Sequence, residues 1–398
     1  MSVTYAEGFR AAAVTAGFKP SGNPDLGLIV GDPGTTAAGL FTTNAFAAAP
    51  VLLSRARLTE GGGAARAVLV NSGQANAATG ARGTTDALAA TAALASHLGL
   101  APEEVLPCST GVIGEPLHMD VLLDALPGLV AALGDGGGEG FARAIMTTDT
   151  VEKRATADAG PYRVGGCAKG VGMISPNLAT MLVFVTTDAA VAPADLHELA
   201  SAQLKPRFNA ITVDGCPSTN DTVLLLASGA AGDEPARPGS AGWAELSQAV
   251  GEVGESLARQ LIADGEGATH VLLVDVTGAA TEPDARVVAN EIADSPLVKT
   301  AVFGEDPNPG RILQAVGSAG VAVDPARVDV WIGDVRVVTA GVIAPEYFDG
   351  DLREAARTAM KEREVRVRVL LGDGAGASRA LGCDLSYEYV RINGEYTT

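Results

Sequence analysis

Residues 169–185 read KGVGMISPNLATMLVFV, a glycine-rich polar segment that runs directly into an apolar one. The apolar run is typical of a short buried strand, and the glycines before it predict a tight loop. The loop therefore delivers Thr180 to the start of the strand, just after the small residue Ala179. A threonine hydroxyl placed there can attack its own preceding carbonyl, so that the Ala179–Thr180 amide becomes an ester that water then cuts. The new chain would begin at Thr180, with a nucleophilic hydroxyl and a free α-amine on one residue, a known way to activate a threonine.

Two plainer interpretations of this segment remain. Thr180 could simply begin a strand after a glycine-rich turn, because Ala-Thr before a strand is common and a short motif needs its structural context. A phosphate cradle is a weaker alternative, because no GKS, GKT or GxGxxG pattern surrounds Gly170 and Gly172.

The run from Lys169 to Leu182 resembles the self-cleavage signature of the glutamate N-acetyltransferase (ornithine acetyltransferase) family of arginine biosynthesis. The likeness extends from Lys19-Pro20-Ser21-Gly22 to Glu395-Tyr396-Thr397-Thr398, so it covers essentially the whole chain. It implies an α/β fold, a helix-covered sheet sandwich of the self-cleaving ornithine acetyltransferase and aminopeptidase type. A smaller C-terminal α/β domain is expected to follow the sandwich.

The resemblance also implies how the chain is divided. We expect residues 1–282 to form the catalytic sandwich, and residues 283–398 to form the C-terminal domain, whose tail returns to the active site. A cut between Ala179 and Thr180 would give an alpha fragment, 1–179, and a beta fragment, 180–398. The two fragments are expected to stay together and to assemble as an alpha2-beta2 heterotetramer.

Individual residues receive roles from the same resemblance. Thr180 is the expected nucleophile, and the hydroxyl of Thr110 with the backbone N–H of Gly111 is the expected oxyanion hole. From the residues alone, the segment around Thr110 and Gly111 suits an ordinary turn as well as a donor pair that approaches a reacting carbonyl. The expected substrate-binding residues are Thr147, Lys169, Thr180, Glu266, Asn393 and Thr398.

The implied reaction moves the acetyl group of N-acetylornithine to glutamate through an acetyl-Thr180 ester, by ping-pong kinetics. No metal and no organic cofactor is expected. Some members of the family also take the acetyl group from acetyl-CoA, and the sequence does not decide between the two kinds. Two alternatives stay open: a self-cleaving aminopeptidase or amidase, in which water is the acceptor, and a non-catalytic protein that binds small molecules.

The composition excludes other classes of function. The chain has 398 residues with 28 basic and 47 acidic side chains, a net charge of −19. Such a surface repels nucleic acids and anionic membranes, and no basic cluster offsets it. No apolar run approaches the roughly 18 residues of a membrane span, and residues 1–20 lack the features of a signal peptide. We expect a cytoplasmic protein that binds neither nucleic acid nor membrane.

The cysteines and histidines are too dispersed for a metal site. No CxxC, HxxxH or HExxH spacing occurs, which argues against zinc and against a disulfide framework. We expect the four cysteines to be small buried residues, with two of them near the site. The cysteines are Cys108, Cys167, Cys216 and Cys383, and the two near the site are Cys167 and Cys216.

Hydrophobic periodicity and turn residues predict a mixed α/β chain. Thr85 is the expected N-cap of one helix. The polar residues Asp214, Asn220 and Asp221 lie in a loop that suits either site support or ordinary turn chemistry. Expected helices cover residues 85–98, 120–133, 141–146, 193–204, 243–263, 295–303 and 351–363. Expected strands cover 67–70, 181–185, 270–276, 328–332, 335–339, 365–370 and 386–392.

Overall fold

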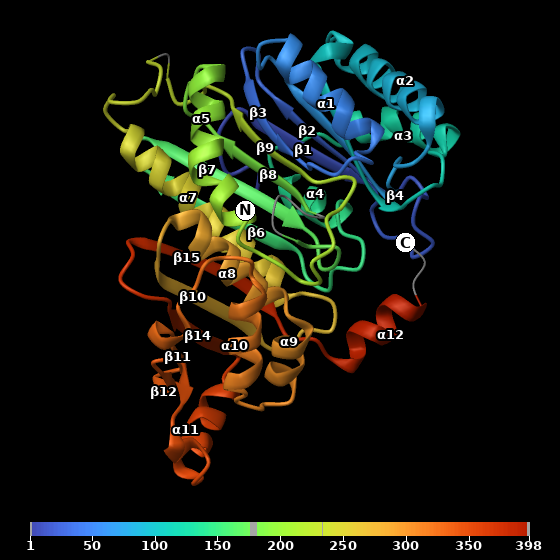
Figure 1. Cartoon of the computed structure of the whole chain (residues 1–398). Coiled ribbons are helices and arrows are strands. Elements are labelled where there is room, and N and C mark those ends of the chain that lie inside the picture. The colour runs from blue at the N-terminus through green and yellow to red at the C-terminus, as the bar shows by residue number, and fades with distance from the viewer. Residues whose placement is uncertain (1, 176–180, 233, 396–398) are drawn as a thin grey trace.

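The computed structural model describes residues 2–175, 181–232 and 234–395 of the chain. The strands of these residues form three sheets, of four, five and six strands. Figure 1 shows the first two sheets together in the upper part of the molecule, flanked by helices, and the third sheet below them. The expected α/β sandwich with a smaller C-terminal α/β unit is therefore confirmed.

The four-stranded sheet is built from the first third of the chain. The neighbours β1 and β2, and β2 and β4, pair antiparallel, whereas β4 and β5 are parallel and are joined by the helix α2 (Gly80–Leu98). Because parallel strands end at the same edge of a sheet, Gly73 and Gly111 lie side by side. In spatial order the strands are β1 (Phe9–Val14), β2 (Leu26–Gly31), β4 (Ala67–Gln74) and β5 (Val105–Val112).

The five-stranded sheet combines strands from before and after residue 180. Its second and third strands, β9 and β8, are parallel to each other and lie between β3 and β7. All six residues of β8 are buried, so the strand predicted from the apolar run at 181–185 is confirmed. In spatial order the strands are β3 (Thr36–Phe41), β9 (Thr222–Ala227), β8 (Leu182–Thr187), β7 (Tyr162–Lys169) and β6 (Lys153–Ala159).

The two sheets pack face to face. Apolar side chains of both inner faces, among them Val70, Leu106, Phe184 and Leu224, form one buried cluster between them. Helices α2 and α3 cover the outer face of the four-stranded sheet, and α5 and α7 cover that of the five-stranded sheet (Figure 1). The helices of the sandwich besides α2 are α1 (Ala49–Glu60), α3 (Met119–Ala131), α4 (Gly138–Ala144), α5 (Pro193–Gln203), α6 (Lys205–Phe208) and α7 (Trp243–Ala263).

The six-stranded sheet carries the C-terminal unit, which has a buried cluster of its own. The expected division between residues 282 and 283 falls just inside α8, which begins at Glu282, whereas hydrogen bonds place the preceding strand β10 inside this sheet. The strands in spatial order are β13 (Val342–Ile343), β12 (Val335–Thr339), β11 (Asp329–Ile332), β14 (Glu364–Leu370), β10 (Val271–Ala279) and β15 (Gly376–Cys383). Its helices are α8 (Glu282–Asp294), α9 (Pro296–Phe303), α10 (Pro309–Ser318) and α11 (Asp351–Met360).

The last described element, α12 (Tyr387–Glu395), corrects a sequence prediction. Residues 386–392 were expected to form a strand, because aromatic and branched residues alternate there with polar ones. The segment is a helix in which Arg391 pairs with Glu388 and Glu395, three and four residues away. Figure 1 shows α12 standing apart from the C-terminal sheet, beside the sandwich.

Two smaller predictions are also wrong. Thr85 is not an N-cap, because α2 begins at Gly80 and the Thr85 hydroxyl donates to the Ala81 carbonyl inside the helix. Of the four cysteines, Cys216 is exposed, whereas the others are buried as expected. No helix of the described residues is long and apolar enough to cross a membrane.

Candidate active site

A cavity of about 250 Å³ lies where the ends of β5 and β7 meet α12. It brings together all the expected site residues that the structure describes: Thr110, Gly111, Thr147, Lys169, Glu266 and Asn393. The cleavage-site residues Ala179 and Thr180, and the expected substrate-binding residue Thr398, lie outside the described residues. The remaining lining residues are Thr148, Val171, Gly172, Met173, Asp214, Cys216 and Tyr389.

The Thr110–Gly111 pair occupies the end of β5, against the parallel strand β4. Gly111 has a φ of +133°, a conformation that favours glycine, and a Cβ there would overlap the backbone of Gly73. The segment is therefore a strand end rather than an ordinary turn. The side-chain amide of Asn220 fastens it, donating to the carbonyls of Ser109 (2.8 Å) and Ala75 (2.6 Å).

Lys169, the last residue of β7, points its ammonium at the same place. Its Nζ lies 3.2 Å from Thr110 Oγ1, and the whole side chain is buried. Burial lowers the pKa of Lys169, and the neighbouring Asp149 carboxylate opposes that shift. A hydroxyl that accepts a hydrogen bond from an ammonium keeps its own proton free to be donated elsewhere. The arrangement therefore leaves the Thr110 O–H available to a third group.

A buried ion network supports this end of β7. Lys153, which is fully buried, lies 2.7 Å from Asp149 Oδ1 and 2.6 Å from Asp264 Oδ2. Asp149 also accepts the backbone N–H groups of Thr147 (3.0 Å) and Gly170 (2.8 Å). Burial alone would raise the pKa of Asp149, but the two lysines beside it hold that pKa below its usual value. The network thus ties the loop after α4 to β7 and to the turn that carries Glu266.

Glu266 turns its carboxylate into the cavity and is held at both oxygens. Thr148 Oγ1 donates to Oε1 at 2.9 Å, and Asn393 Nδ2 of α12 donates to Oε2 at 2.8 Å. Glycine at residue 172 leaves room for the carboxylate in this position, since a Cβ there would lie 2.5 Å from Oε2 and the carboxylate would have to shift. The second glycine of the motif at residues 169–172 therefore leaves room for the Glu266 carboxylate.

Asp214 is a second carboxylate in the same cavity. It accepts the N–H of Met173 (2.7 Å) and the hydroxyl of Tyr389 (3.1 Å), so it joins the motif loop to α12. Burial raises the pKa of Asp214, and the Glu266 charge adds to that shift. Met173 itself has a positive φ of 52°, which is uncommon for a non-glycine residue and is seen at functional sites.

Asp221 anchors the chain immediately after residue 180. The N–H of Met181 donates to Asp221 Oδ1 at 3.0 Å, and the Met181 carbonyl accepts the N–H of Thr222 at 3.0 Å. Asp221 is fully buried, and burial raises its pKa well above the usual value. Lys169 pairs with Leu182 across the β7–β8 ladder, so Met181 is one residue away from the partner of Lys169.

Sequence reasoning missed four contributors to the site: Thr148, Asp149, Lys153 and Tyr389. The first two stand in a polar run after α4 that also suits a helix end, and Lys153 looks like a solvated surface residue. Tyr389 faces the cavity only because α12 is a helix. Of the two cysteines expected near the site, Cys216 lines the cavity, and Cys167 lies in β7 with its side chain in the core between the sheets.

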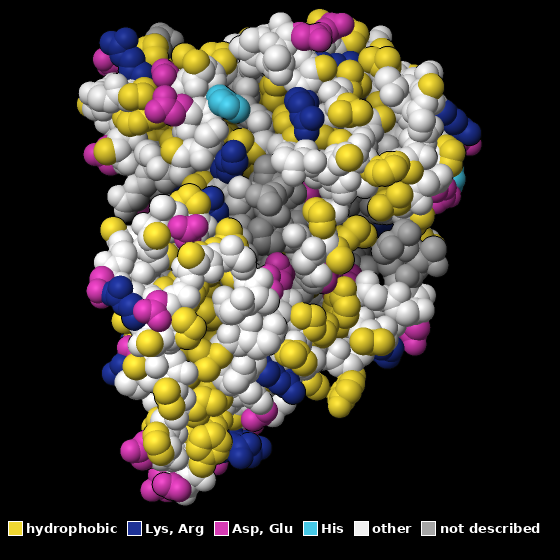
Figure 2. All heavy atoms as spheres, in the orientation of Figure 1, with side chains coloured by type: hydrophobic (Ala, Val, Ile, Leu, Met, Phe, Trp, Pro, Cys, Tyr) yellow, Lys and Arg dark blue, Asp and Glu magenta, His cyan; other side chains and the backbone are white. Residues whose placement is uncertain are grey.

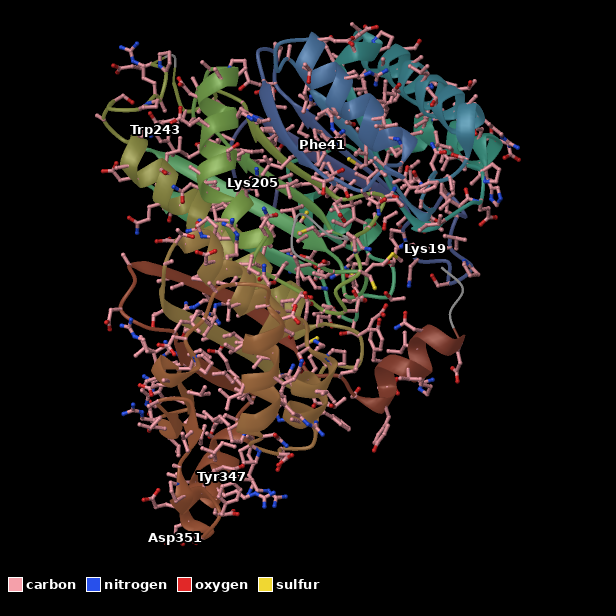
Figure 3. All side chains as sticks on the ribbon, in the orientation of Figure 1. Lys19, Phe41, Lys205, Trp243, Tyr347 and Asp351 are labelled. Atoms are coloured by element: carbon pink, nitrogen blue, oxygen red, sulfur yellow. The ribbon has the colours of Figure 1, made fainter. Side chains whose placement is uncertain are left out.

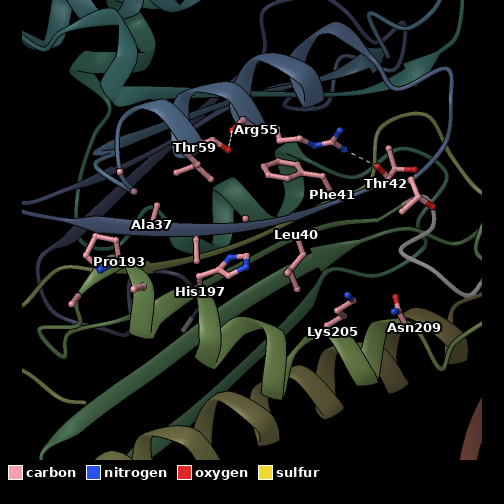
Figure 4. A pocket seen from close by; sticks show the side chains of 18 of the residues that line it. Ala37, Leu40, Phe41, Thr42, Arg55, Thr59, Pro193, His197, Lys205 and Asn209 are labelled. Atoms are coloured by element: carbon pink, nitrogen blue, oxygen red, sulfur yellow. Dashed lines mark hydrogen bonds between the residues drawn. The ribbon is translucent and has the colours of Figure 1, made fainter. Parts of the chain in front are cut away.

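A metal is not suggested by the side chains. Among the described residues, no group of three or more histidine, cysteine or carboxylate side chains is arranged to hold a metal ion. A larger cavity, of about 1150 Å³, lies between the edge strand β3 and the helices α1 and α5 (Figure 4). Its lining includes Phe41, Arg55, His197 and Lys205, but none of the expected site residues. Basic side chains and a histidine flank the corresponding hollow in the upper part of Figure 2.

Comparisons with known proteins show the family of the chain. The model of the ArgJ family matches residues 10–398. The arginine biosynthesis bifunctional protein ArgJ of Parasynechococcus marenigrum is 48% identical over 100% of this chain and 95% of its own length. The protein of the same name from Geobacter sulfurreducens is 47% identical over 98% of this chain and 99% of its own.

A solved structure gives the same answer. The crystal structure of the arginine biosynthesis bifunctional protein argJ from Bacillus halodurans is 42% identical, with a TM-score of 0.51. The match covers 54% of this chain and 98% of the solved chain. The matches to the family model and to the two curated relatives extend over nearly the whole sequence, so they include the glycine motif around which the cavity is built. The chain belongs to the ArgJ family.

Proposed function

We propose that this chain cuts itself between Ala179 and Thr180 and then acts as a glutamate N-acetyltransferase. It moves the acetyl group of N-acetylornithine to glutamate by way of an acetyl-Thr180 ester. The observation that carries the proposal is the cavity that gathers Thr110, Lys169 and Glu266 from separate segments. Lys169 of that cavity pairs with Leu182 at the start of β8, and the chain is fastened there at Met181, one residue after the proposed nucleophile.

The proportions of the solved relative support the cut. Residues 180–398 are 219 of the 398 residues, or about 55% of the chain. The solved Bacillus halodurans chain is almost wholly covered by a match to 54% of this chain. A relative whose solved chain has the length of the beta fragment fits a protein that is cut before residue 180.

The hydroxyl of Thr110 and the backbone N–H of Gly111 suit the oxyanion. When Thr180 Oγ attacks the acetyl carbonyl, negative charge develops on the carbonyl oxygen. The proton of Thr110 is free to meet that charge, because the Thr110 oxygen already accepts from Lys169 (3.2 Å). The buried ammonium of Lys169 adds positive charge close to the same point, where the low dielectric makes it effective.

The steps balance as an acetyl exchange. Thr180 Oγ bonds to the acetyl carbon, its proton passes to the Thr180 α-amine, and the amide C–N bond breaks as ornithine takes that proton. An α-amine has a reference pKa of about 7.7–8.0, so it can act as base and then as acid near neutral pH. The amine of glutamate next attacks the acetyl-Thr180 ester. N-acetylglutamate leaves, and Thr180 regains its hydroxyl proton.

Two charged side chains of the cavity suit different charged groups of the substrate. Lys169 suits the α-carboxylate that donor and acceptor share. Glu266 is held by two neutral donors, so its negative charge is left for an ammonium, such as the side-chain ammonium of ornithine. Thr147, whose N–H is fixed by Asp149, together with Asn393 and Thr398, completes the proposed binding set.

The wider proposal concerns assembly and donors. We take the two fragments to remain associated and to pair as alpha2-beta2 in the cytoplasm, with residues 1–282 as the catalytic unit and 283–398 as the C-terminal one. The relatives are named bifunctional, which fits acetyl-CoA as a second acetyl donor. The resemblance in sequence supports each of these points.

The testing experiment follows the acetyl group. The purified protein is incubated with N-acetylornithine alone, and the fragments are then weighed by mass spectrometry. The fragment that starts at Thr180 should gain one acetyl group and lose it to glutamate faster than to water. Discharge to acetate that ignores glutamate would identify a hydrolase, and a protein that is never cut would be a binding protein. The uncut Thr180→Ala variant is the control.

A further inference from the structure

Lys19 carries an ammonium that is half-buried beside the site. Its Nζ lies 3.0 Å from the Met146 carbonyl and 3.5 Å from the Ala144 carbonyl. Among the described residues these are its hydrogen-bond acceptors, and none of their carboxylates forms an ion pair with it. The nearby Asp25 already accepts three backbone N–H groups, including that of Lys19. An ammonium with two carbonyl acceptors keeps a third hydrogen for another partner.

That ammonium faces a cavity of about 580 Å³, which adjoins the substrate cavity. Thr147 lines both cavities and therefore stands between them. The other charged side chains of the lining have partners of opposite charge, because Arg143 pairs with Glu152, and Asp149 pairs with Lys153. Lys19 is thus the cation of the lining that forms no direct ion pair with a described residue, although the carboxylates of Asp25 and Asp149 are near enough to act on its charge.

The substrate cavity itself has the wrong charge for one of the two proposed substrates. It contains two carboxylates, Asp214 and Glu266, against the single ammonium of Lys169. An ammonium on the donor side chain is attracted to that pair. A second carboxylate, such as the one on the glutamate side chain, is repelled by it, and the repulsion is strong in a partly buried site.

We propose that the cavity beside Lys19 is a separate subsite for the side-chain carboxylate of the acceptor. This inference rests on the proposed function. Donor and acceptor share an α-carbon with the same substituents, so both hold their α-carboxylate and α-nitrogen in one place. Their side chains differ, and rotation about the Cα–Cβ bond sends them to different sides of Thr147. The cationic side chain goes toward Glu266, and the anionic one goes toward Lys19.

The charge of Lys19 gives the subsite a pH dependence. Burial lowers the pKa of Lys19 to about 8, with the Lys169 charge adding to the shift and the carboxylates of Asp25 and Asp149 opposing it. Arg143 and Glu152 also face the cavity as a pair. Above pH 8 Lys19 therefore loses its charge, and the remaining cation of the lining, Arg143, is paired with Glu152. The KM for glutamate should rise there, whereas the KM for an uncharged acceptor should not.

The test compares acceptors of the same shape but different charge. Acetylated enzyme is prepared with N-acetylornithine and discharged with glutamate or with glutamine. Lys19→Met should reduce the preference for glutamate by about 10- to 100-fold, the range expected for one charge-assisted hydrogen bond. Lys19→Arg should keep the preference and remove its loss above pH 8, because arginine stays charged. Lys205→Met, at an exposed lysine well apart from Lys19 in Figure 3, is the matched control.

Results that contradict the Lys19 subsite can be told apart from results that contradict the proposed function. Lys19 also contacts the carbonyl of Ala144, the last residue of α4, and that of Met146 just beyond it. A purely structural role would therefore lower stability and both half-reactions together, with the preference for glutamate unchanged. That result would overturn the proposal. A wild-type protein that is never acetylated would instead refute the proposed function.

Discussion

Gly172 leaves the space that the Glu266 carboxylate occupies. A Cβ on residue 172 would lie 2.5 Å from Glu266 Oε2 and 2.8 Å from its Cδ. Gly172→Ala should therefore displace Glu266 from Thr148 and Asn393 and reduce kcat/KM for N-acetylornithine by up to about 100-fold, because a small misplacement of the bound substrate can cost that much. Steady-state kinetics measures this loss. Gly128→Ala, where a Cβ meets nothing within 4 Å, is the control and should leave kinetics unchanged.

Thr110 is expected to act through its hydroxyl. Thr110→Ala should lower kcat by about 10²–10³, the typical effect of removing one oxyanion donor. The variant should also lose about 1–3 kcal/mol of unfolding free energy, because the buried Lys169 ammonium loses an acceptor. Thr110→Ser keeps the hydroxyl and should restore most of the rate. If Thr110→Ala lost stability but kept its turnover, the oxyanion role would be wrong.

Lys153 neutralises two buried carboxylates, Asp149 and Asp264. Lys153→Met would leave both uncompensated, and breaking a buried pair in this way costs about 3–5 kcal/mol of unfolding free energy. Urea unfolding followed by circular dichroism measures the change. The comparison variant is Arg286→Met, which removes an exposed pair with Glu282 and should cost at most about 1 kcal/mol. Equal effects of the two substitutions would show that the buried network is unimportant.

Asp221 should make the unfolding free energy depend on pH. Burial raises its folded-state pKa above the unfolded value of about 3.9, so the folded state binds more protons above that pH. The contribution of Asp221 is therefore fully present below pH 3.9 and is lost as pH rises through the folded-state pKa. Asp221→Asn keeps an acceptor for Met181 but cannot ionise. The difference in thermal midpoint between variant and wild type should grow as pH rises from about 4 to 7. A constant difference would contradict the assigned pKa shift.

Local sequence patterns located some elements of the sandwich, but only two of the nine described strands in its two sheets were expected with bounds. In the apolar run after Thr180 and in the amphipathic segment that forms α7, the local pattern of apolar residues indicates which side chains are buried. Both elements were therefore predicted with nearly their observed bounds. The segment at 386–392 misled, because Tyr387, Tyr389 and Ile392 suit a strand. Its helical form depends on two contacts with distant residues, Tyr389 to Asp214 and Asn393 to Glu266, which no local window contains.

Site residues that belong to a family motif could be predicted from the sequence. Residues whose role comes from contact with a distant residue could not. Lys169 and Glu266 came from the likeness to the family, and the structure places both in one cavity. Lys153 gave no signal, since its burial between Asp149 and Asp264 arises only when the loop after α4 packs against the turn after α7. Gly172 was visible as a glycine, but its reason, the carboxylate of residue 266, lies far along the chain.

The order of strands in the five-stranded sheet determines whether folding is a first-order or a second-order reaction. β8 and β9 follow residue 180, and they lie between β3 and β7, which precede it. In a chain cut before Thr180, two strands of one polypeptide are threaded between two of the other. The uncut precursor reaches this arrangement as one molecule, at a rate that ignores concentration. The cut protein, once unfolded, must bring two molecules together, so its recovery becomes second order and fails on dilution. After cleavage, the unfolded mature enzyme would therefore not refold in dilute solution.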